Sequence, residues 1–294
     1  MMNNFGEVLT AMVTPFDKEM QVDLDKTREL AVYLIENGSD GLVVLGTTGE
    51  VPTLRFEEKI QVLEAVVDEV GDRAIIVAGT GSYSTEASIE MTQKAEEIGV
   101  DGIMLVTPYY NKPPQSGLYN HFKMVANSTS LPILLYNVPG RTSRNIEAET
   151  VLKLSEIENI VAIKEASGDM NQVSTLTRIL PDDFAVYSGD DNLILPVLSV
   201  GGQGIVSVAA HLVGNDIKKM IMEFKNGNLA EAVQMNKRLG ELFKAIFVTT
   251  NPIPVKHALN LMGMRVGSVR PPLNDVTPFE DQFLLSILQE FELV

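Results

Sequence analysis

The chain has 294 residues, 45% of them hydrophobic and none of them cysteine, and its formal net charge at pH 7 is −16. This length holds one large domain or two medium ones, and the lack of cysteine excludes disulfides and thiolate chemistry. Because nucleic acids and anionic membranes attract basic surfaces, the acidic balance disfavours both as partners.

Two further features bear on the location of the protein. No apolar run reaches about 18 residues without a charge, so we expect no membrane span. Residues 1–16, MMNNFGEVLTAMVTPF, lack the basic segment that begins a signal peptide. Together with the absence of cysteine, these features predict a cytoplasmic protein.

Apolar runs of strand length alternate with amphipathic runs of helical length through most of the chain. The expected strands are Val8–Phe16, Gly41–Gly46, Ala74–Gly79, Gly102–Pro108, Ile133–Val138, Ile160–Glu165, Phe184–Gly189 and Gly204–Val208. The expected helices between them include Leu24–Glu36, Phe56–Val70, Glu86–Ile98 and Gly117–Asn127. Strands that alternate with helices in this way indicate a parallel sheet.

The number of strand–helix units favours a closed sheet. Eight units fill roughly 220 residues, which fits a (β/α)₈ TIM barrel, a fold that usually takes about 250 residues. A doubly wound open α/β sheet is the alternative, but no G-x-G-x-x-G motif opens the first helix. We therefore expect an α/β protein with a TIM barrel.

From about residue 212 onward the strand patterns stop and helical patterns continue to the end of the chain. They cover Ala230–Phe247, Pro254–Met262 and Glu280–Glu290. We expect residues 1–225 to form the barrel that carries the active site, and residues 226–294 to form an α-helical extension packed on it.

In a TIM barrel, the reacting groups lie at the carboxyl ends of the strands. The polar side chains expected at these ends are Thr47, Thr48, Glu50, Thr107, Tyr109, Tyr110, Tyr136, Asn137, Arg141, Lys164, Ser188, Asp190, Asp191 and Ser207. We therefore expect the site at this end of the barrel.

Lys164 is the most informative of these residues because it directly follows a strand that should be buried. Side chains alternate along a strand, so Lys164 shares the inward face with Ala162, and Glu165 points outward as a structural residue. Burial favours the neutral amine, which can form a Schiff base with a carbonyl substrate. Alternatively, the lysine extends into solvent at the strand end or pairs with Asp190. The strand alone leaves both interpretations open.

The other motifs are weak when each is taken alone. GTTGE can be an ordinary glycine-rich turn or a turn whose backbone N–H groups bind a carboxylate. In YNVPGRT, Tyr136 is either a core residue or a proton shuttle, and Arg141 is either solvated or a carboxylate ligand. The three histidines show no metal-ligand spacing, so we expect neither a metal nor a metal-dependent aldolase.

In order along the chain, the motifs form a specific set from Val13 to Leu273. They are VTPF, LGTTGE, AGTGS, VTPYYNKPPQSGLYNHF, LYNVPGRT, IVAIKEASGD, YSGDD, GGQGIVSV, NPIPVKHAL and RPPL. This set resembles the dihydrodipicolinate synthase family of pyruvate-dependent class I aldolases. With this resemblance, Lys164 is favoured as the catalytic amine.

The resemblance implies a lyase that needs no cofactor. Lys164 would form an imine with pyruvate, and the derived enamine would add to the aldehyde of aspartate β-semialdehyde. Cyclisation and release of the lysine would give 4-hydroxy-tetrahydrodipicolinate, in the diaminopimelate route to lysine. By the same resemblance, Tyr136, Thr47 and Tyr110 would form a proton relay.

The resemblance also implies the substrate contacts and the assembly. Tyr110 would reach the site of a neighbouring subunit, so activity would need at least a dimer, and a homotetramer of two tight dimers is common in the family. The pyruvate carboxylate would be bound by Thr48 and by the backbone of Thr47. Gly189 and Val206 would line the pocket, and Arg141 would bind the carboxylate of the semialdehyde.

Other functions within the superfamily remain as alternatives, namely N-acetylneuraminate lyase and 2-keto-3-deoxy-gluconate aldolase. A non-catalytic barrel that binds a keto acid is an alternative of a different class. The positions that match the family's lysine-binding pocket beside Tyr109 are Val51, Pro52, Phe56, Lys59, Tyr83 and Ala87. Because several are apolar and one is a cation, we predict weak or absent feedback by lysine.

Overall fold

The computed structural model describes residues 5–294, so the first four residues of the expected barrel domain lie outside the described part. Eight strands form a closed barrel in chain order, which confirms the predicted fold class. The strands are β1 (Val8–Ala11), β2 (Gly41–Val44), β3 (Ile75–Gly79), β4 (Gly102–Val106), β5 (Ile133–Asn137), β6 (Ile160–Glu165), β7 (Ala185–Ser188) and β8 (Gly204–Ser207).

The strands are nearly continuous apolar runs because both of their faces are covered. Every residue of β1, β2, β5, β6 and β8 is buried, although β6 ends in a lysine and a glutamate. A parallel barrel buries one face of each strand in its interior and the other beneath the surrounding helices. The charged end of β6 is therefore an exception that needs partners.

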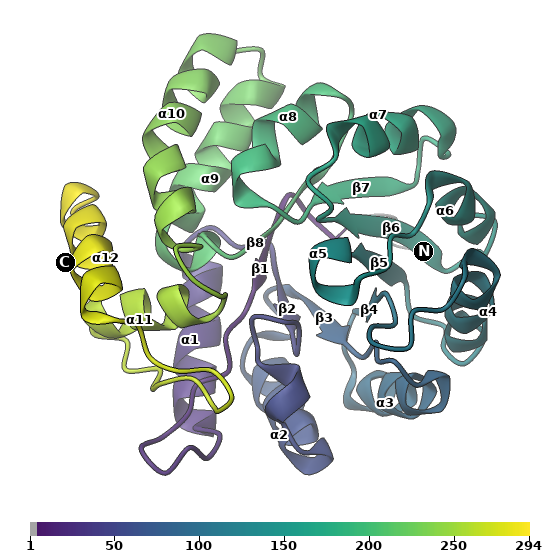
Figure 1. Ribbon diagram of the computed structural model, residues 1–294, viewed down its shortest axis with the longest axis horizontal. Coiled ribbons are helices and arrows are strands. Elements are labelled where there is room, and N and C mark those ends of the chain that lie inside the picture. The colour runs from purple at the N-terminus through teal and green to yellow at the C-terminus, as the bar shows by residue number, and fades with distance from the viewer. Residues whose placement is uncertain (1–4) are drawn as a thin grey trace. The chain divides into compact units, whose positions relative to one another are not determined.

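The chain forms two compact units. One unit comprises residues 5–7 and Ile75–Val206. Its helices are α3 (Thr85–Ile98), α4 (Gln115–Ala126), α5 (Pro139–Thr142), α6 (Ala148–Leu154), α7 (Met170–Ile179) and α8 (Ile194–Ser199). The parallel pairing of β5 with β6 sets Tyr136 opposite Lys164 and Asn137 opposite Glu165. Figure 1 shows α4 and α6 as neighbours outside these strands, and the two helices contact each other.

The other unit comprises Val8–Ala74 and Ser207–Val294. Its helices are α1 (Leu24–Glu36), α2 (Phe56–Val70), α9 (Ala210–Lys225), α10 (Leu229–Ala245), α11 (Ile253–Leu261) and α12 (Pro278–Glu290), with a short 3₁₀ helix η1 (Val51–Thr53). In Figure 1, α12 lies at the yellow end of the chain beside α10 and α11, both of which it contacts. The boundary expected after residue 225 falls in the turn between α9 and α10.

The first strand is shorter than the sequence indicated. The apolar run continues to Phe16, but β1 ends at Ala11. Beyond it, the N–H of Val13 donates to Nε2 of His211 at 3.1 Å, and the N–H of Phe16 donates to the carbonyl of Val266 at 3.0 Å. These residues are buried by the C-terminal segment, so their hydrophobicity reflects contacts outside the sheet.

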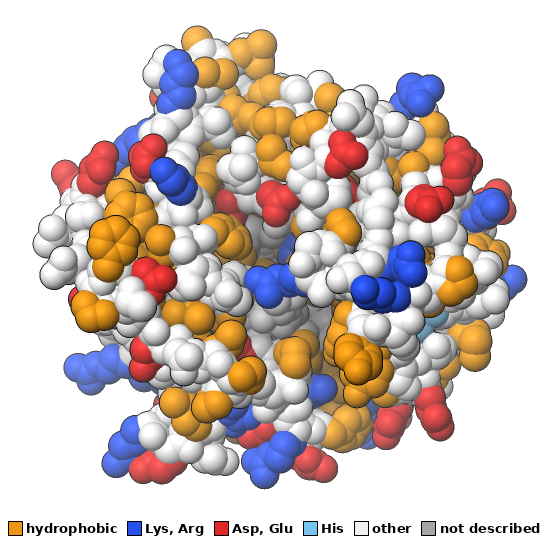
Figure 2. All heavy atoms as spheres, viewed as in Figure 1, with side chains coloured by type: hydrophobic (Ala, Val, Ile, Leu, Met, Phe, Trp, Pro, Cys, Tyr) orange, Lys and Arg blue, Asp and Glu red, His pale blue; other side chains and the backbone are white. Residues whose placement is uncertain are grey.

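None of the helices from residue 5 onward combines the length and the apolar character needed to cross a bilayer. Figure 2 shows acidic, basic and apolar side chains intermixed on the face that it presents. On that face, the acidic side chains are therefore not gathered into one patch.

Candidate active site

The structure brings together two of the predicted catalytic residues, Lys164 and Tyr136. Lys164 lies near the end of β6 and is 5% exposed, and Tyr136 lies near the end of β5 and is 6% exposed. The Lys164 Nζ is 4.3 Å from the centroid of the Tyr136 ring. The parallel register explains this contact because it sets the two residues directly opposite each other.

Because Gly189 has no side chain, it leaves room for the side chain of Lys164. A Cβ at this position would lie 2.6 Å from the Cβ of Ala166 and 3.0 Å from the Cε of Lys164. Gly189 itself is fixed by its N–H, which donates to the carbonyl of Glu165 at 2.7 Å. The structure thus places Gly189 against the lysine stem, next to the amine that the sequence singled out.

The sequence left open a pairing of Lys164 with Asp190. In the described part of the chain, Lys164 makes no ion pair with a carboxylate. Burial raises the pKa of the Asp190 carboxyl, and the nearby charge of Lys164 opposes this rise. The two groups therefore influence each other through space without forming a salt bridge.

Glu165 points outward, as the alternation along the strand predicted, and it is held by several donors. Its carboxylate accepts from Nδ2 of Asn137 at 2.9 Å, from Nε2 of Gln172 at 2.8 Å and from the N–H of Ser167 at 2.7 Å. Asn137 also accepts from the N–H of Ile146 at 3.0 Å. Because Asn137 and Glu165 are the next residues after Tyr136 and Lys164, this network fixes the ends of both strands.

Three further predicted residues lie in the same unit. Arg141 is exposed on α5, and Val206 is fully buried in β8. Tyr110 is 92% exposed and has a φ of +70°, which is uncommon for a residue with a bulky side chain. A single chain therefore does not bring Tyr110 to the buried Lys164.

Thr47 and Thr48 lie in the other unit, in the turn that follows β2. The turn is closed by the N–H of Gly49 donating to the carbonyl of Gly46 at 3.1 Å, and by the N–H of Glu50 donating to the carbonyl of Thr47 at 3.0 Å. Thr48 is 3% exposed, and its Oγ1 accepts from Nδ2 of Asn251 at 2.9 Å. The glycine-rich turn predicted from GTTGE is thus present, and contacts from outside hold it.

Sequence reasoning named Glu50 but missed the two cationic residues that hold it. Glu50 ends the turn and is buried, and its carboxylate pairs with Lys256 of α11 at 2.9 Å. The N–H of Arg270 donates to the same carboxylate at 2.8 Å. The signal was present in the motifs NPIPVK and RPPL, which contain these two cations but lie about 200 residues away in the sequence.

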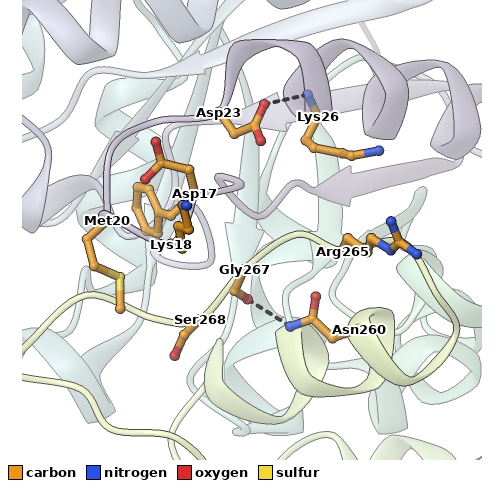
Figure 3. Close-up of a pocket in the computed structure, with 10 residues that line it drawn as sticks. Asp17, Lys18, Met20, Asp23, Lys26, Asn260, Arg265, Gly267 and Ser268 are labelled. Atoms are coloured by element: carbon orange, nitrogen blue, oxygen red, sulfur yellow. Dashed lines mark hydrogen bonds between the residues drawn. The ribbon is translucent and has the colours of Figure 1, made fainter.

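A separate hollow of about 640 Å³ lies in the unit that contains α1 and α11, and Figure 3 shows it in close-up. One of its carboxylates caps a helix, since Asp23 accepts from the N–H of Lys26 at 3.0 Å. None of the residues predicted for the active site lines it. The lining residues are Phe16, Asp17, Lys18, Met20, Asp23, Lys26, Asn260, Arg265, Gly267 and Ser268.

Within residues 5–294, no three histidine, cysteine, aspartate or glutamate side chains gather in a way that would hold a metal ion. The site presents a buried amine beside a phenol ring. An amine placed in this way can form a carbon–nitrogen double bond with a carbonyl compound.

Comparison with known proteins agrees with this geometry. The model of the dihydrodipicolinate synthetase family matches residues 4–291. The 4-hydroxy-tetrahydrodipicolinate synthase of Desulforudis audaxviator is 57% identical over 291 residues, which cover 99% of this chain and 99% of that protein.

Solved structures give the same result. Dihydrodipicolinate synthase DapA-2 from Bacillus anthracis is 51% identical with a TM-score of 0.96, over 97% of this chain and 98% of that one. The enzyme from Cyanidioschyzon merolae with lysine bound is 47% identical with a TM-score of 0.97, over 99% of each chain. The chain therefore belongs to the dihydrodipicolinate synthetase family.

Proposed function

We propose that this chain condenses pyruvate with aspartate β-semialdehyde to give 4-hydroxy-tetrahydrodipicolinate, in the diaminopimelate route to lysine. The observation that carries the proposal is the buried amine of Lys164, 4.3 Å from the ring centroid of Tyr136 at the end of two adjacent barrel strands. Relatives that are more than 50% identical over 98–99% of this chain are named for this activity. The reaction needs no cofactor.

Lys164 begins the reaction as a nucleophile. Its neutral amine attacks the keto carbon of pyruvate, and loss of water from the adduct gives an imine. The imine loses a proton from the adjacent methyl group and becomes an enamine, whose carbon is nucleophilic. Tyr136 lies against the amine and transfers protons in these steps, because a phenol within reach can act as a general acid and base.

The second half of the reaction joins the two substrates. The enamine carbon attacks the aldehyde carbon of the semialdehyde, which forms the new carbon–carbon bond and a hydroxyl group. The amino group of the semialdehyde then attacks the imine carbon and displaces Lys164, which closes the ring and regenerates the free amine. Thr47 and Tyr110 complete the proton relay in this proposal.

The remaining predicted residues bind the substrates. We assign the pyruvate carboxylate to the hydroxyl of Thr48 and the backbone of Thr47, because a tight turn presents N–H groups to an anion. Gly189 and Val206 line the pocket, and the contact of Gly189 with the side chain of Lys164 supports this role for Gly189. Arg141 binds the carboxylate of the semialdehyde from its exposed position on α5.

We further propose a cytoplasmic homotetramer built from two tight dimers. The exposure of Tyr110, 92%, supports a role in the site of a neighbouring subunit, because an active-site tyrosine is not expected to face solvent. Residues 1–225 are proposed as the catalytic barrel and residues 226–294 as its extension.

Feedback by lysine is proposed to be weak or absent. At the positions that match the effector pocket, this chain carries Val51, Pro52 and Ala87, which offer no side-chain hydrogen bond, and the cation Lys59. The Cyanidioschyzon merolae relative was crystallised with lysine bound. We expect millimolar lysine to leave the initial rate unchanged, and inhibition at sub-millimolar lysine would contradict this proposal.

Borohydride reduction tests the central proposal. In the presence of pyruvate, reduction should add one pyruvate-derived adduct to Lys164, detected by peptide mass spectrometry, and Lys164→Ala should remove it. A barrel that merely binds a keto acid would gain no adduct. Aspartate β-semialdehyde and N-acetylmannosamine are then compared as acceptors, and faster pyruvate consumption with the amino sugar would replace the proposed function by that of a sialate lyase.

A further inference from the structure

The mechanism above does not use a buried charged cluster in the unit that carries Thr47 and Thr48. Glu50 is 3% exposed and ends the turn that contains these threonines, with a φ of +55°. Lys256 is 1% exposed and comes from α11, more than 200 residues later in the chain. Two buried opposite charges are thus brought together beside a candidate binding turn.

Several contacts hold Lys256 beside Glu50. Its Nζ donates to Oε1 of Glu50 at 2.9 Å, to the carbonyl of Thr14 at 3.0 Å and to the carbonyl of Ser268 at 2.6 Å. The same Nζ lies 4.1 Å from the centroid of the Phe16 ring. An ammonium group has three N–H donors, and each one here has an acceptor.

Arg270 holds the second oxygen of Glu50. Its backbone N–H donates to Oε2 of Glu50 at 2.8 Å. Its guanidinium donates to both carboxylate oxygens of Glu58, at 2.7 and 3.0 Å, and to the carbonyl of Met20 at 2.7 Å. The two oxygens of Glu50 therefore reach two separate segments of the C-terminal part of the chain.

The two residues before Glu50 are also held from outside the turn. Oγ1 of Thr14 donates to the carbonyl of Gly49 at 2.7 Å. Nδ2 of Asn251 donates to Oγ1 of Thr48 at 2.9 Å, so this hydroxyl accepts from the amide and directs its own proton elsewhere. Each of three consecutive residues in the turn, Thr48, Gly49 and Glu50, thus has at least one external contact.

Stability does not by itself account for a buried ion pair. Replacing such a pair by apolar or neutral groups of similar volume is often neutral or stabilising, because two charges no longer have to be desolvated. The pair instead fixes the positions of the groups that it joins, since charge-assisted hydrogen bonds are short and have a defined geometry. The geometry of the turn is what the pair controls here.

We propose that Glu50, Lys256 and Arg270 are positioning residues that hold the 47–50 turn in the shape that binds the carboxylate of pyruvate. The proposal rests on the proposed function, because it assigns that carboxylate to Thr47 and Thr48. It also gives a task to the C-terminal part of the chain, which supplies Lys256 from α11 and Asn251 and Arg270 from segments outside the helices, and which contributes none of the groups assigned to the chemistry.

The test is the double substitution Glu50→Gln/Lys256→Met, which removes both charges together and leaves no buried ion without a partner. The readout is the pyruvate concentration that gives half-maximal borohydride trapping on Lys164, together with KM for each substrate and kcat. We expect half-saturation by pyruvate to rise at least about tenfold, because a displacement of about 1 Å can cost on the order of 100-fold. At saturating pyruvate, kcat and KM for the semialdehyde should change far less.

The matched control is Lys26→Met/Glu29→Gln, the same pair of changes at an ion pair on α1 whose side chains are 29% and 60% exposed. It should leave half-saturation by pyruvate unchanged. If the test variant does not fold, Glu50→Gln/Lys256→Gln is measured in its place, since it also removes both charges together, keeps polar groups beside the carbonyls of Thr14 and Ser268, and should shift half-saturation in the same direction.

The outcomes distinguish a failure of the positioning role from a failure of the proposed function. A folded test variant with the half-saturation of the parent chain would overturn the positioning role, even if its melting temperature had fallen. A parent chain that traps no pyruvate would overturn the proposed function, and this inference with it. A raised half-saturation in the test variant and not in the control supports the inference.

Discussion

The environment of Lys164 decides how its amine can approach a substrate. The stem packs against Gly189, where a Cβ would lie 3.0 Å from Cε, and the amine lies on the ring face of Tyr136. Long lysine side chains normally lose much of their rotamer freedom on ordering. In this structure, packing restricts the rotamers of Lys164 before any substrate binds, so the amine points in one direction.

Tyr136→Phe keeps the ring that contacts the amine and removes only the phenol hydroxyl. Because general acid–base groups typically contribute about 10²–10⁴-fold, we expect kcat to fall within that range. Pyruvate binding and borohydride trapping should remain largely intact. Tyr119→Phe, at a partly exposed tyrosine of α4, is the control, and a Tyr136→Phe enzyme with the parent rate would exclude a proton-transfer role.

Gly189→Ala should impair catalysis only because the added methyl group takes up space that the side chain of Lys164 needs. The added Cβ would meet Cε of Lys164 and the Cβ of Ala166, so the amine must move, and we expect kcat/KM to fall by about 10- to 100-fold. Gly240→Ala in α10 is the control, because nothing lies within 4 Å of its Cβ. There we expect full activity and a gain of about 0.5–1 kcal/mol in the free energy of unfolding.

At the scale of elements, a buried histidine joins the chain after β1 to helix α9. Nε2 of His211 accepts from the N–H of Val13 at 3.1 Å, so Nδ1 carries the proton and donates to the carbonyl of Val208 at 2.9 Å. Both ring nitrogens are therefore committed in the neutral form. A second proton would face the N–H of Val13, and burial lowers the pKa of His211 to about 4.

Mild acid should therefore destabilise the fold through His211. Because the pKa of His211 is lowered from 6.5 to about 4 in the folded state, the unfolded chain binds the proton first as pH falls. This contribution to stability is present above about pH 6.5 and is lost towards pH 4, by roughly 3 kcal/mol. Denaturant unfolding at several pH values should show this loss, and His211→Gln should reduce its slope. An unchanged slope in the variant would contradict the assignment.

At the scale of the whole molecule, one chain places Lys164 in its interior and Tyr110 on its surface. Lys164 is 5% exposed and Tyr110 is 92% exposed. If Tyr110 acts in the site of a neighbour, each complete site takes the amine from one chain and the phenol from another. Complementation between two impaired variants tests this arrangement directly.

Lys164→Ala and Tyr110→Phe chains are purified separately, mixed in equal amounts, dissociated and allowed to reassociate. A mixed dimer has one site with an intact lysine and a tyrosine supplied by its neighbour. Random pairing should restore activity to about a quarter of the parent value, since half of the dimers are mixed and each has one complete site. If Tyr110 serves its own chain, the mixture should give only the mean of the two variants.

Several features followed from the sequence alone. The alternation of apolar strand runs with helical runs predicted the parallel barrel, because each periodicity is a local property of the chain. The inward direction of Lys164 and the outward direction of Glu165 followed from the two-residue period of a strand. The set of motifs indicated the family, and the family model matches residues 4–291.

Only the tertiary structure decided which distant groups meet. The end of β1 depends on His211 and Val266, and the turn at Thr48 and Glu50 depends on contacts from Asn251 and Lys256. No local pattern encodes such contacts, because an ion pair is set by the distance between two side chains in space and not by their separation in sequence. The residue types were present in the sequence, but folding alone determined their partners.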